Sequence, residues 1–170
     1  RHDMIAETLH KVLVDNGIDA ELETYAREIN MPLRPDIIVR TKNCNYLIDI
    51  KSPYDRIKNF DEARALNEAK YKDMASNMQV ATQKTCIVKT FVIGALGSWD
   101  PRNTEILNRL GIPETSIADM ARTMTIQSLK DSLYIFRRHI VRRSLQGQAF
   151  AEQEAEKEGA AEGTVGEVEA

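Results

Sequence analysis

The sequence predicts a mixed α/β fold, in which a small central sheet is flanked by helices. Short runs rich in Ile and Val, bounded by polar turn residues, indicate buried strands. Longer segments carry apolar residues at the three- and four-residue spacing of amphipathic helices. In chain order the elements are a helix, three strands, a helix, a strand and further helices, and this order is typical of a layered α/β domain.

The chain begins with a predicted helix and a predicted strand. Apolar residues recur at helical spacing over Asp3–Asn16, and Gly17 follows as a C-terminal glycine should. Apolar positions then alternate over Ala20–Tyr25, which is the pattern of a strand with one buried face.

A hairpin and a crossover are expected next. The strands Asp36–Val39 and Tyr46–Ile50 are joined by the short polar link Thr41–Asn45, so they should pair as a hairpin. A helix over Asp61–Met78 follows, with its first residue as the N-cap. The segment Cys86–Ala95 has the composition of another strand.

The last part of the chain is expected to be helical and then disordered. Asp100 and Pro101 open a helix that Gly111 closes, and a long helix runs over Ser116–Gln146. We assign residues 1–146 to one domain. Residues 147–170 are rich in Glu, Ala and Gly and offer little to bury, so they predict an acidic, disordered tail.

Composition narrows the possible functions. The net charge of −3 does not describe the predicted domain, because residues 1–151 hold 22 Lys and Arg against 19 Asp and Glu and are therefore mildly basic. Cys44 and Cys86 are far apart and predict neither a disulfide framework nor a zinc site. No apolar stretch is long enough to span a membrane. Because the chain begins at Arg1, we expect it to be a piece of a longer protein.

Two aspartates and a lysine stand in the hairpin strands. Asp49 and Lys51 are two residues apart and therefore share one face of a strand. Asp36 begins the neighbouring strand and should meet them at one end of the sheet. Charged groups are costly to bury without partners, and two carboxylates with the carbonyl of Ile50 would suit Mg²⁺ or Mn²⁺. This spacing predicts a metal-dependent site. The alternative is a surface hairpin with a solvated Asp–Lys pair.

Further candidates surround this group. Lys70 and Tyr71 lie on the face of the following helix that should pack on the sheet, and they are candidate catalytic residues. The alternatives are that Lys70 only snorkels to solvent and that Tyr71 only packs. Glu23 is a candidate third metal ligand and Glu7 its competitor. We expect each of these glutamates to be a surface residue unless the fold brings it to the site.

A basic stretch near the end of the predicted domain is a candidate contact for nucleic acid. It is either a solvated helix end or a patch that binds phosphates. The arginines expected to contact nucleic acid are Arg34, Arg137, Arg138, Arg142 and Arg143.

Several of these motifs together resemble a known family, the restriction-like endonuclease domain of site-specific non-LTR retrotransposons. More broadly, they resemble the PD-(D/E)xK nuclease superfamily. The resemblance covers about residues 1–146. It rests on the segments Arg1-His2-Asp3, Arg34-Pro35-Asp36, Asp49-Ile50-Lys51, Lys70-Tyr71, Gly97-Ser98-Trp99 and Leu110-Gly111.

The resemblance implies a PD-(D/E)xK fold and a DNA endonuclease that uses Mg²⁺ or Mn²⁺. Such a domain belongs to a reverse transcriptase polyprotein, acts in the nucleus and nicks target DNA to prime reverse transcription. The resemblance implies that Asp36 and Asp49 bind the metal and that Lys51 or Lys70 is the catalytic lysine. The family often carries a lysine four residues before the tyrosine, where this chain has Asn67, with Lys70 next to Tyr71 instead. This departure favours Lys51 as the catalytic lysine.

Two other functions remain open on the sequence. One is a junction-resolving or repair nuclease on the same fold. The other is a catalytically inactive module that only binds nucleic acid or protein. Intact Asp36, Asp49 and Lys51 favour an enzyme over the inactive module, because an inactive module gains nothing from buried charges. A reverse transcriptase upstream in the full gene would favour the retrotransposon nuclease.

Overall fold

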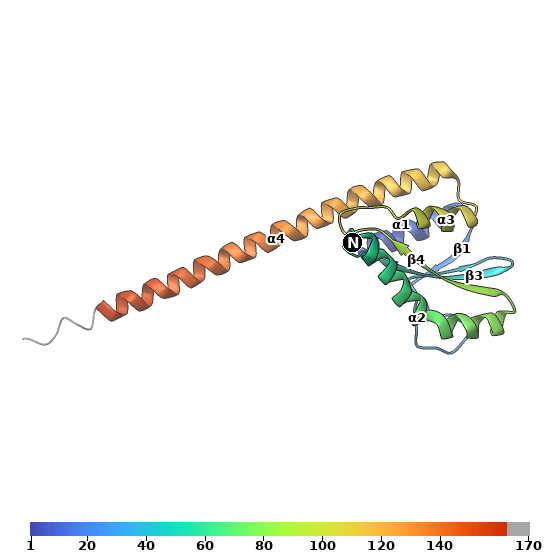
Figure 1. Cartoon of the computed structure of the whole chain (residues 1–170), viewed down its shortest axis with the longest axis horizontal. Helices are drawn as coiled ribbons and strands as arrows, with labels where there is room; N and C mark the ends of the chain where they lie inside the picture. Colours follow the sequence, from blue (N-terminus) through green and yellow to red (C-terminus); the bar gives the residue numbers. More distant parts are fainter. Residues whose placement is uncertain (163–170) are drawn as a thin grey trace, which may run out of the picture. The chain divides into compact units, whose positions relative to one another are not determined.

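The computed structural model describes the backbone of residues 1–162 and the side chains of residues 1–142. The chain divides into two compact units, Arg1–Asp131 and Ser132–Ala170. The first unit contains a four-stranded mixed sheet with helices packed against it (Figure 1). The predicted α/β class is therefore confirmed.

The sheet is a meander with one crossover. Its strand order is β1-β2-β3-β4. Strands β1 (Asp19–Leu22), β2 (Ile37–Arg40) and β3 (Cys44–Lys51) pair antiparallel, so the predicted hairpin is confirmed. Strand β4 (Thr85–Val92) runs parallel to β3. A parallel pair needs a long connection, and helix α2 (Ile57–Thr82) provides it.

Each face of the sheet has its own apolar core. Side chains alternate along β3, so Tyr46, Ile48 and Ile50 enter one core, while Leu47 enters the other. The first core is covered by α1 (His2–Asp15), by α3 (Pro101–Arg109) and by the start of α4 (Glu114–Glu162). The second is covered by α2, and Asp49 belongs to this face because it follows Leu47 by two residues.

The start of α2 differs from the prediction. The helix begins at Ile57 with Arg56 as N-cap, so the expected N-cap Asp61 was wrong. Asp61 lies inside the first turns, where its carboxylate instead accepts hydrogen bonds from Arg64 (3.1 Å) and Arg102 (2.9 Å). An aspartate suits both an N-cap and an exposed ion pair, so the residue type alone did not fix the boundary.

Helix α4 (Glu114–Glu162) is longer than predicted. It includes residues 147–162, which the sequence predicted to be disordered, and residues 163–170 lie outside the described residues. Ala, Glu, Gln and Lys are good helix formers, so a segment with no apolar face can still be helical. Among the described residues, no helix is long and apolar enough to cross a membrane.

Helix α3 (Pro101–Arg109) starts as predicted. The Asp100 carboxylate accepts a hydrogen bond from the Arg102 N–H at 2.9 Å, and Pro101 is the first helical residue. This helix also protects the end of β4. Asn103 is fully buried, and its side-chain amide pairs with both the N–H and the C=O of Val92 at 2.9 and 2.7 Å.

Replacing Asn103 with Ala should destabilise the fold, because both backbone groups of Val92 would lose their partner inside the protein. We expect the free energy of unfolding to fall by about 2–4 kcal/mol, since each buried unpaired group costs about 1–3 kcal/mol. Urea unfolding would measure the change. The control is Asn108→Ala on the exposed side of the same helix, and equal losses in the two variants would contradict the role of Asn103.

Candidate active site

The two predicted acids meet at one end of the hairpin. Ile37 is opposite Ile48 in the β2–β3 register, which makes Asp36 and Asp49 the next opposed pair. Asp36 comes before the first residue of β2, whereas Asp49 is inside β3. The turn length and the apolar pattern of both strands fix this register, and so they bring the two carboxylates together.

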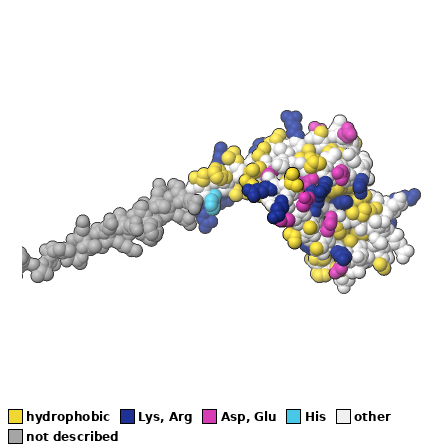
Figure 2. All heavy atoms as spheres, in the orientation of Figure 1, with side chains coloured by type: hydrophobic (Ala, Val, Ile, Leu, Met, Phe, Trp, Pro, Cys, Tyr) yellow, Lys and Arg dark blue, Asp and Glu magenta, His cyan; other side chains and the backbone are white. Residues whose placement is uncertain are grey.

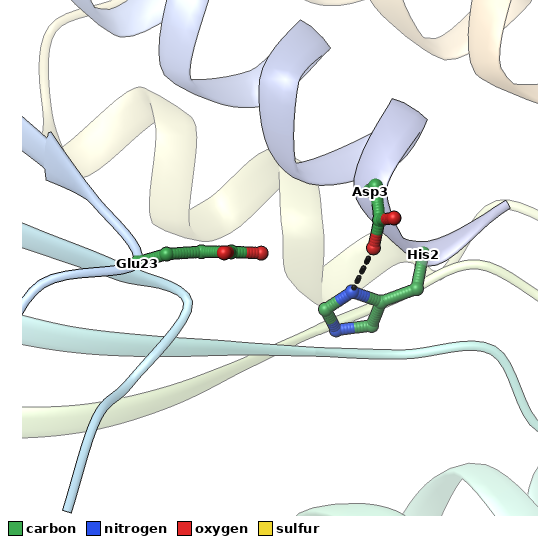
Figure 3. A group of neighbouring side chains, drawn as sticks. All are labelled: His2, Asp3 and Glu23. Atoms are coloured by element: carbon green, nitrogen blue, oxygen red, sulfur yellow. Dashed lines mark hydrogen bonds and ion pairs between the residues drawn. The ribbon is translucent and has the colours of Figure 1, made fainter.

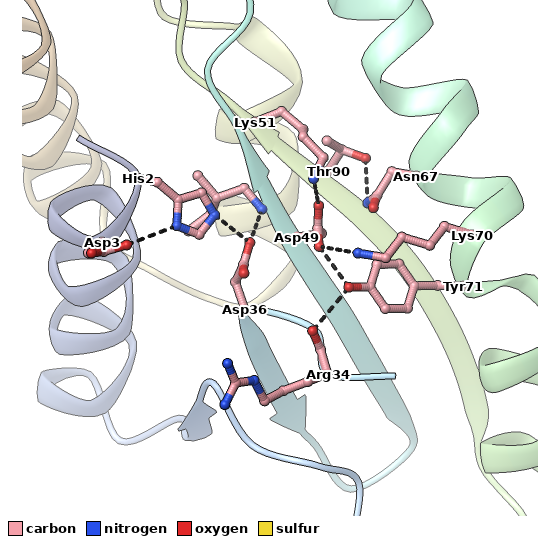
Figure 4. A network of polar contacts seen from close by, with 11 residues as sticks. His2, Asp3, Arg34, Asp36, Asp49, Lys51, Asn67, Lys70, Tyr71 and Thr90 are labelled. Atoms are coloured by element: carbon pink, nitrogen blue, oxygen red, sulfur yellow. Dashed lines mark hydrogen bonds and ion pairs between the residues drawn. The ribbon is translucent and has the colours of Figure 1, made fainter. Parts of the chain in front are cut away.

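Asp49 is the buried centre of the site, with 2% of its surface exposed (Figure 4). The Tyr71 hydroxyl donates a hydrogen bond to Asp49 Oδ1 at 2.8 Å, and the Lys70 ammonium lies 3.5 Å from the same oxygen. Lys51 forms an ion pair with Asp49 Oδ2. All three predicted partners therefore reach one carboxylate, and the two lysines remain partly open to solvent.

Tyr71 holds the carboxylate in place. Its side chain is fully buried. Burial, followed by the hydrogen bond and negative charge of Asp49, raises the pKa of the Tyr71 hydroxyl well above its usual range. The hydroxyl therefore stays protonated and remains a donor. Because it is enclosed by protein, Tyr71 is a positioning residue rather than a group that can touch a substrate.

Asp36 is tied to two parts of the chain. Its Oδ2 accepts a hydrogen bond from the Ile50 N–H at 2.5 Å and lies 3.0 Å from Nε2 of His2. Nδ1 of His2 is 3.3 Å from a carboxylate oxygen of Asp3. The first turn of α1 therefore contributes to the site.

Glu23 lies on the same side of the site as His2 (Figure 3). Donor atoms of His2, Asp3 and Glu23 all lie within 4.8 Å of one another, and this group does not include Glu7. Glu23 has a positive φ of 45°, and its N–H donates to the Asp36 carbonyl at 2.7 Å. Both Asp3 and Glu23 are exposed. The structure thus brings Glu23 next to Asp36, His2 and Asp3.

Asn67 stands at the position where the family that this chain resembles often carries a lysine, but it does not perform the role of that lysine. It is fully buried, and its amide donates to the Thr90 hydroxyl at 2.9 Å. Thr90 is the register partner of Asp49 in the neighbouring strand. Asn67 therefore supports the strand beside the site, and Lys70 is the residue of α2 that brings a positive charge to Asp49.

The predicted nucleic-acid contacts lie in two places. In the first unit the Arg34 side chain is exposed, and its carbonyl oxygen lies 3.2 Å from the hydroxyl oxygen of Tyr71. In the second unit Arg137, Arg138 and Arg142 are exposed on α4, where hydrophobic and basic side chains occur together (Figure 2). The side chain of Arg143 lies outside the described residues.

The donors at this site suit a hard divalent cation. Asp49 Oδ2 is buried and receives no hydrogen bond of ordinary geometry from the described residues, and the Lys51 ammonium is its ion-pair partner. Asp36 supplies a second carboxylate, and carboxylate oxygens are the ligands that Mg²⁺ and Mn²⁺ prefer. Asp36 and Asp49 are therefore the residues that would hold such an ion.

Comparison with models of known protein families gives no match for this chain, and neither does comparison with curated proteins.

Proposed function

We propose that this chain is a metal-dependent DNA endonuclease with a PD-(D/E)xK fold. The observation that carries the proposal is the convergence of Asp36, Asp49, Lys51 and Lys70 at one edge of the sheet. A buried carboxylate with two lysines and a second acid beside it is costly for a fold to maintain. The hairpin followed by a helical crossover is the arrangement that such nucleases need.

The proposed roles follow from the contacts. Asp36 and Asp49 hold a Mg²⁺ or Mn²⁺ ion, which when bound acidifies a water molecule and polarises a phosphodiester. Lys51 and Lys70 approach Asp49 from the solvent side, where they stabilise negative charge on the phosphate. His2 orients Asp36, and Tyr71 orients Asp49.

The resemblance further supports a role within a non-LTR retrotransposon polyprotein. In this role, which places the protein in the nucleus, the nick supplies the 3′-hydroxyl for reverse transcription. Reverse transcriptase sequence upstream of Arg1 in the full gene would support this context. Its absence would leave a junction-resolving or repair nuclease on the same fold.

The test of the proposed activity is a nicking assay on supercoiled plasmid with Mg²⁺, Mn²⁺ or EDTA. We expect open-circular DNA with either metal and none with EDTA. Folded protein that binds the plasmid but leaves it supercoiled under every condition would contradict the endonuclease and favour a binding module. A variant of the site must be purified in parallel from the same host strain. Nicking by both preparations would then identify a contaminating host nuclease.

The arginines of α4 in the second unit, Arg137, Arg138 and Arg142, are proposed to bind DNA phosphates. Replacing Arg138 and Arg142 with Gln should weaken binding to all sequences alike. The slope of log affinity against log salt should fall by about 1.8, because each phosphate contact contributes roughly 0.9. Fluorescence anisotropy at several salt concentrations would measure it. The control is Arg122→Gln, because Arg122 is exposed in the first unit. An unchanged slope in the double variant would mean that Arg138 and Arg142 are only solvated and do not contact phosphates.

A further inference from the structure

The loop that follows β3 is held in one conformation, although much of it is exposed. Asp55 is the residue that holds it, because its carboxylate accepts hydrogen bonds from the Leu96 N–H at 2.5 Å and from the Ser98 N–H at 3.0 Å. Residues 52–56 are therefore tied to residues 94–98, which form the loop after β4.

A buried glycine makes this close fit of the two loops possible. A side chain at Gly94 would clash with the Asp55 carboxylate, so only glycine leaves the room that Asp55 occupies. Beside this contact, the Ala95 N–H donates a hydrogen bond to the Pro53 carbonyl at 2.7 Å. The backbone of the loop is therefore already ordered before a ligand binds, and ordering it costs a ligand little affinity.

The ordered loop carries an exposed aromatic ring and a cation as a pair. Tyr54 is 58% exposed, and the Arg56 guanidinium lies over its ring, 5.8 Å from the ring centroid. Because Arg56 covers one face of the ring, the exposed area lies on the other face and the edge. Lys58 pairs with Glu62 at 3.6 Å, whereas no carboxylate among the described residues forms an ion pair with Arg56. Its charge is therefore available to a ligand.

This pair lies next to the proposed active site. Tyr54 is three residues beyond Lys51, so at most about 11 Å of chain separates the two. The loop starts from a fixed point, because the Lys51 carbonyl accepts a hydrogen bond from the Ile93 N–H at 3.1 Å. Successive nucleotides of one strand are about 3.4 Å apart along the duplex axis. A phosphate held at Lys51 therefore brings nucleotides within about three positions of the cut to Tyr54.

We propose that Tyr54 stacks on an unpaired base of the DNA substrate beside the cleaved phosphate, while Arg56 binds a neighbouring phosphate. This inference rests on the proposed action on DNA. Exposed aromatic rings beside cations are the groups with which proteins hold single-stranded nucleic acid. A ring reaches the face of a base only where that base has left the helical stack. The loop therefore favours DNA that is opened near the cut over a perfect duplex.

A surface for a protein partner is the competing interpretation. Ile57 and Leu96 are 83% and 50% exposed, and exposed apolar side chains also suit contact with a protein. The unpaired charge of Arg56 favours a polyanion instead. The loop also continues directly from Lys51, in a part of the surface that must stay open to DNA if the proposed reaction is to occur. We therefore assign the loop to DNA.

The test measures binding in EDTA, so that cleavage plays no part. Two labelled DNAs share one strand; in one it is fully paired, and in the other a short bubble is left unpaired. Fluorescence anisotropy with the whole chain should show about tenfold tighter binding of the bubble, the effect of stacking one base on an aromatic ring. Tyr54→Ala should lose this preference, and Tyr54→Phe, which keeps the ring, should retain it. The control is Val80→Ala, which removes a 76% exposed side chain near the other end of α2 and should also retain it.

The salt dependence of binding tests Arg56 separately. Arg56→Gln should lower the slope of log affinity against log salt on the bubble by about 0.7, because one phosphate contact on a single strand is lost. An unchanged slope would contradict the contact of Arg56 with a phosphate.

Equal affinity of the wild type for both DNAs would overturn the proposal and leave the loop as a surface for a protein partner. A bubble preference that survives in Tyr54→Ala would overturn it as well. The plasmid assay keeps the two proposals apart. Nicking without a bubble preference would remove only the stacking loop, whereas a bubble preference that depends on Tyr54, without nicking, would remove only the nuclease.

Discussion

Replacing Asp49 with Asn should lower the rate of Mg²⁺-dependent plasmid nicking by well over a hundredfold. Loss of a residue that only supports a metal ligand already costs about 10–100-fold, and Asp49 is proposed to be a ligand itself. Asn keeps the size of the side chain but removes the charge that meets Lys51 and Lys70. Asp49→Ala should be equally inactive, because the charge and not the volume is needed.

The binding of DNA separates this effect from unfolding. Removal of a negative charge near two lysines should leave affinity for duplex DNA unchanged or higher, since phosphate contacts dominate it. The matched control is Asp73→Asn, which removes an exposed carboxylate from the same unit and should nick at the wild-type rate. Nicking by highly purified Asp49→Asn at a rate near that of the control would remove Asp49 from the mechanism.

Replacing Tyr71 with Ala should have the largest effect on stability. The ring is fully buried in the core between α2 and the sheet. Deleting a buried aromatic side chain costs about 3–5 kcal/mol, and the Asp49 carboxylate would also lose its hydroxyl donor. For a domain of ordinary stability this is a large part of the total, so urea unfolding should show a much lower midpoint or no folded baseline.

Tyr71→Phe distinguishes the hydroxyl from the ring. The ring still fills its place, so the free energy of unfolding should fall by only about 1–2 kcal/mol for the lost hydrogen bond to a charged group. Nicking should fall by about 10–100-fold, as for a residue that orients a metal ligand. Tyr25→Phe, on an exposed tyrosine, is the control. Full activity of Tyr71→Phe would make the ring a packing residue only.

The hairpin was predictable from sequence because its signals are local. Apolar runs interrupted by a polar link predicted β2 and β3, and the two-residue period predicted that Asp49 and Lys51 share a face. Tyr71 and Lys70 followed from helical spacing. The contacts of Lys70 and Tyr71 with Asp49 then needed only that α2 packs on that face, as its apolar residues require.

The contribution of His2 could not be predicted in the same way. No local pattern links it to Asp36, which lies 34 positions later, and the pairing depends on how α1 crosses the other face of the sheet. The start of α2 was predicted wrongly because an aspartate suits both an N-cap and an ion pair. In the fold, Asp61 pairs with Arg64 and Arg102 instead of capping the helix.

The polar centre around Asp49 is local along the chain, which has a consequence for folding. Its direct contacts are to Lys51, Lys70 and Tyr71, and the farthest of these is 22 positions away. Structures of low contact order form early and quickly. A growing chain therefore has this centre within reach once α2 has been made, before β4 completes the parallel pair. The buried charges are then partnered by neighbours from the outset, and the rest of the domain closes over a centre that is already neutralised.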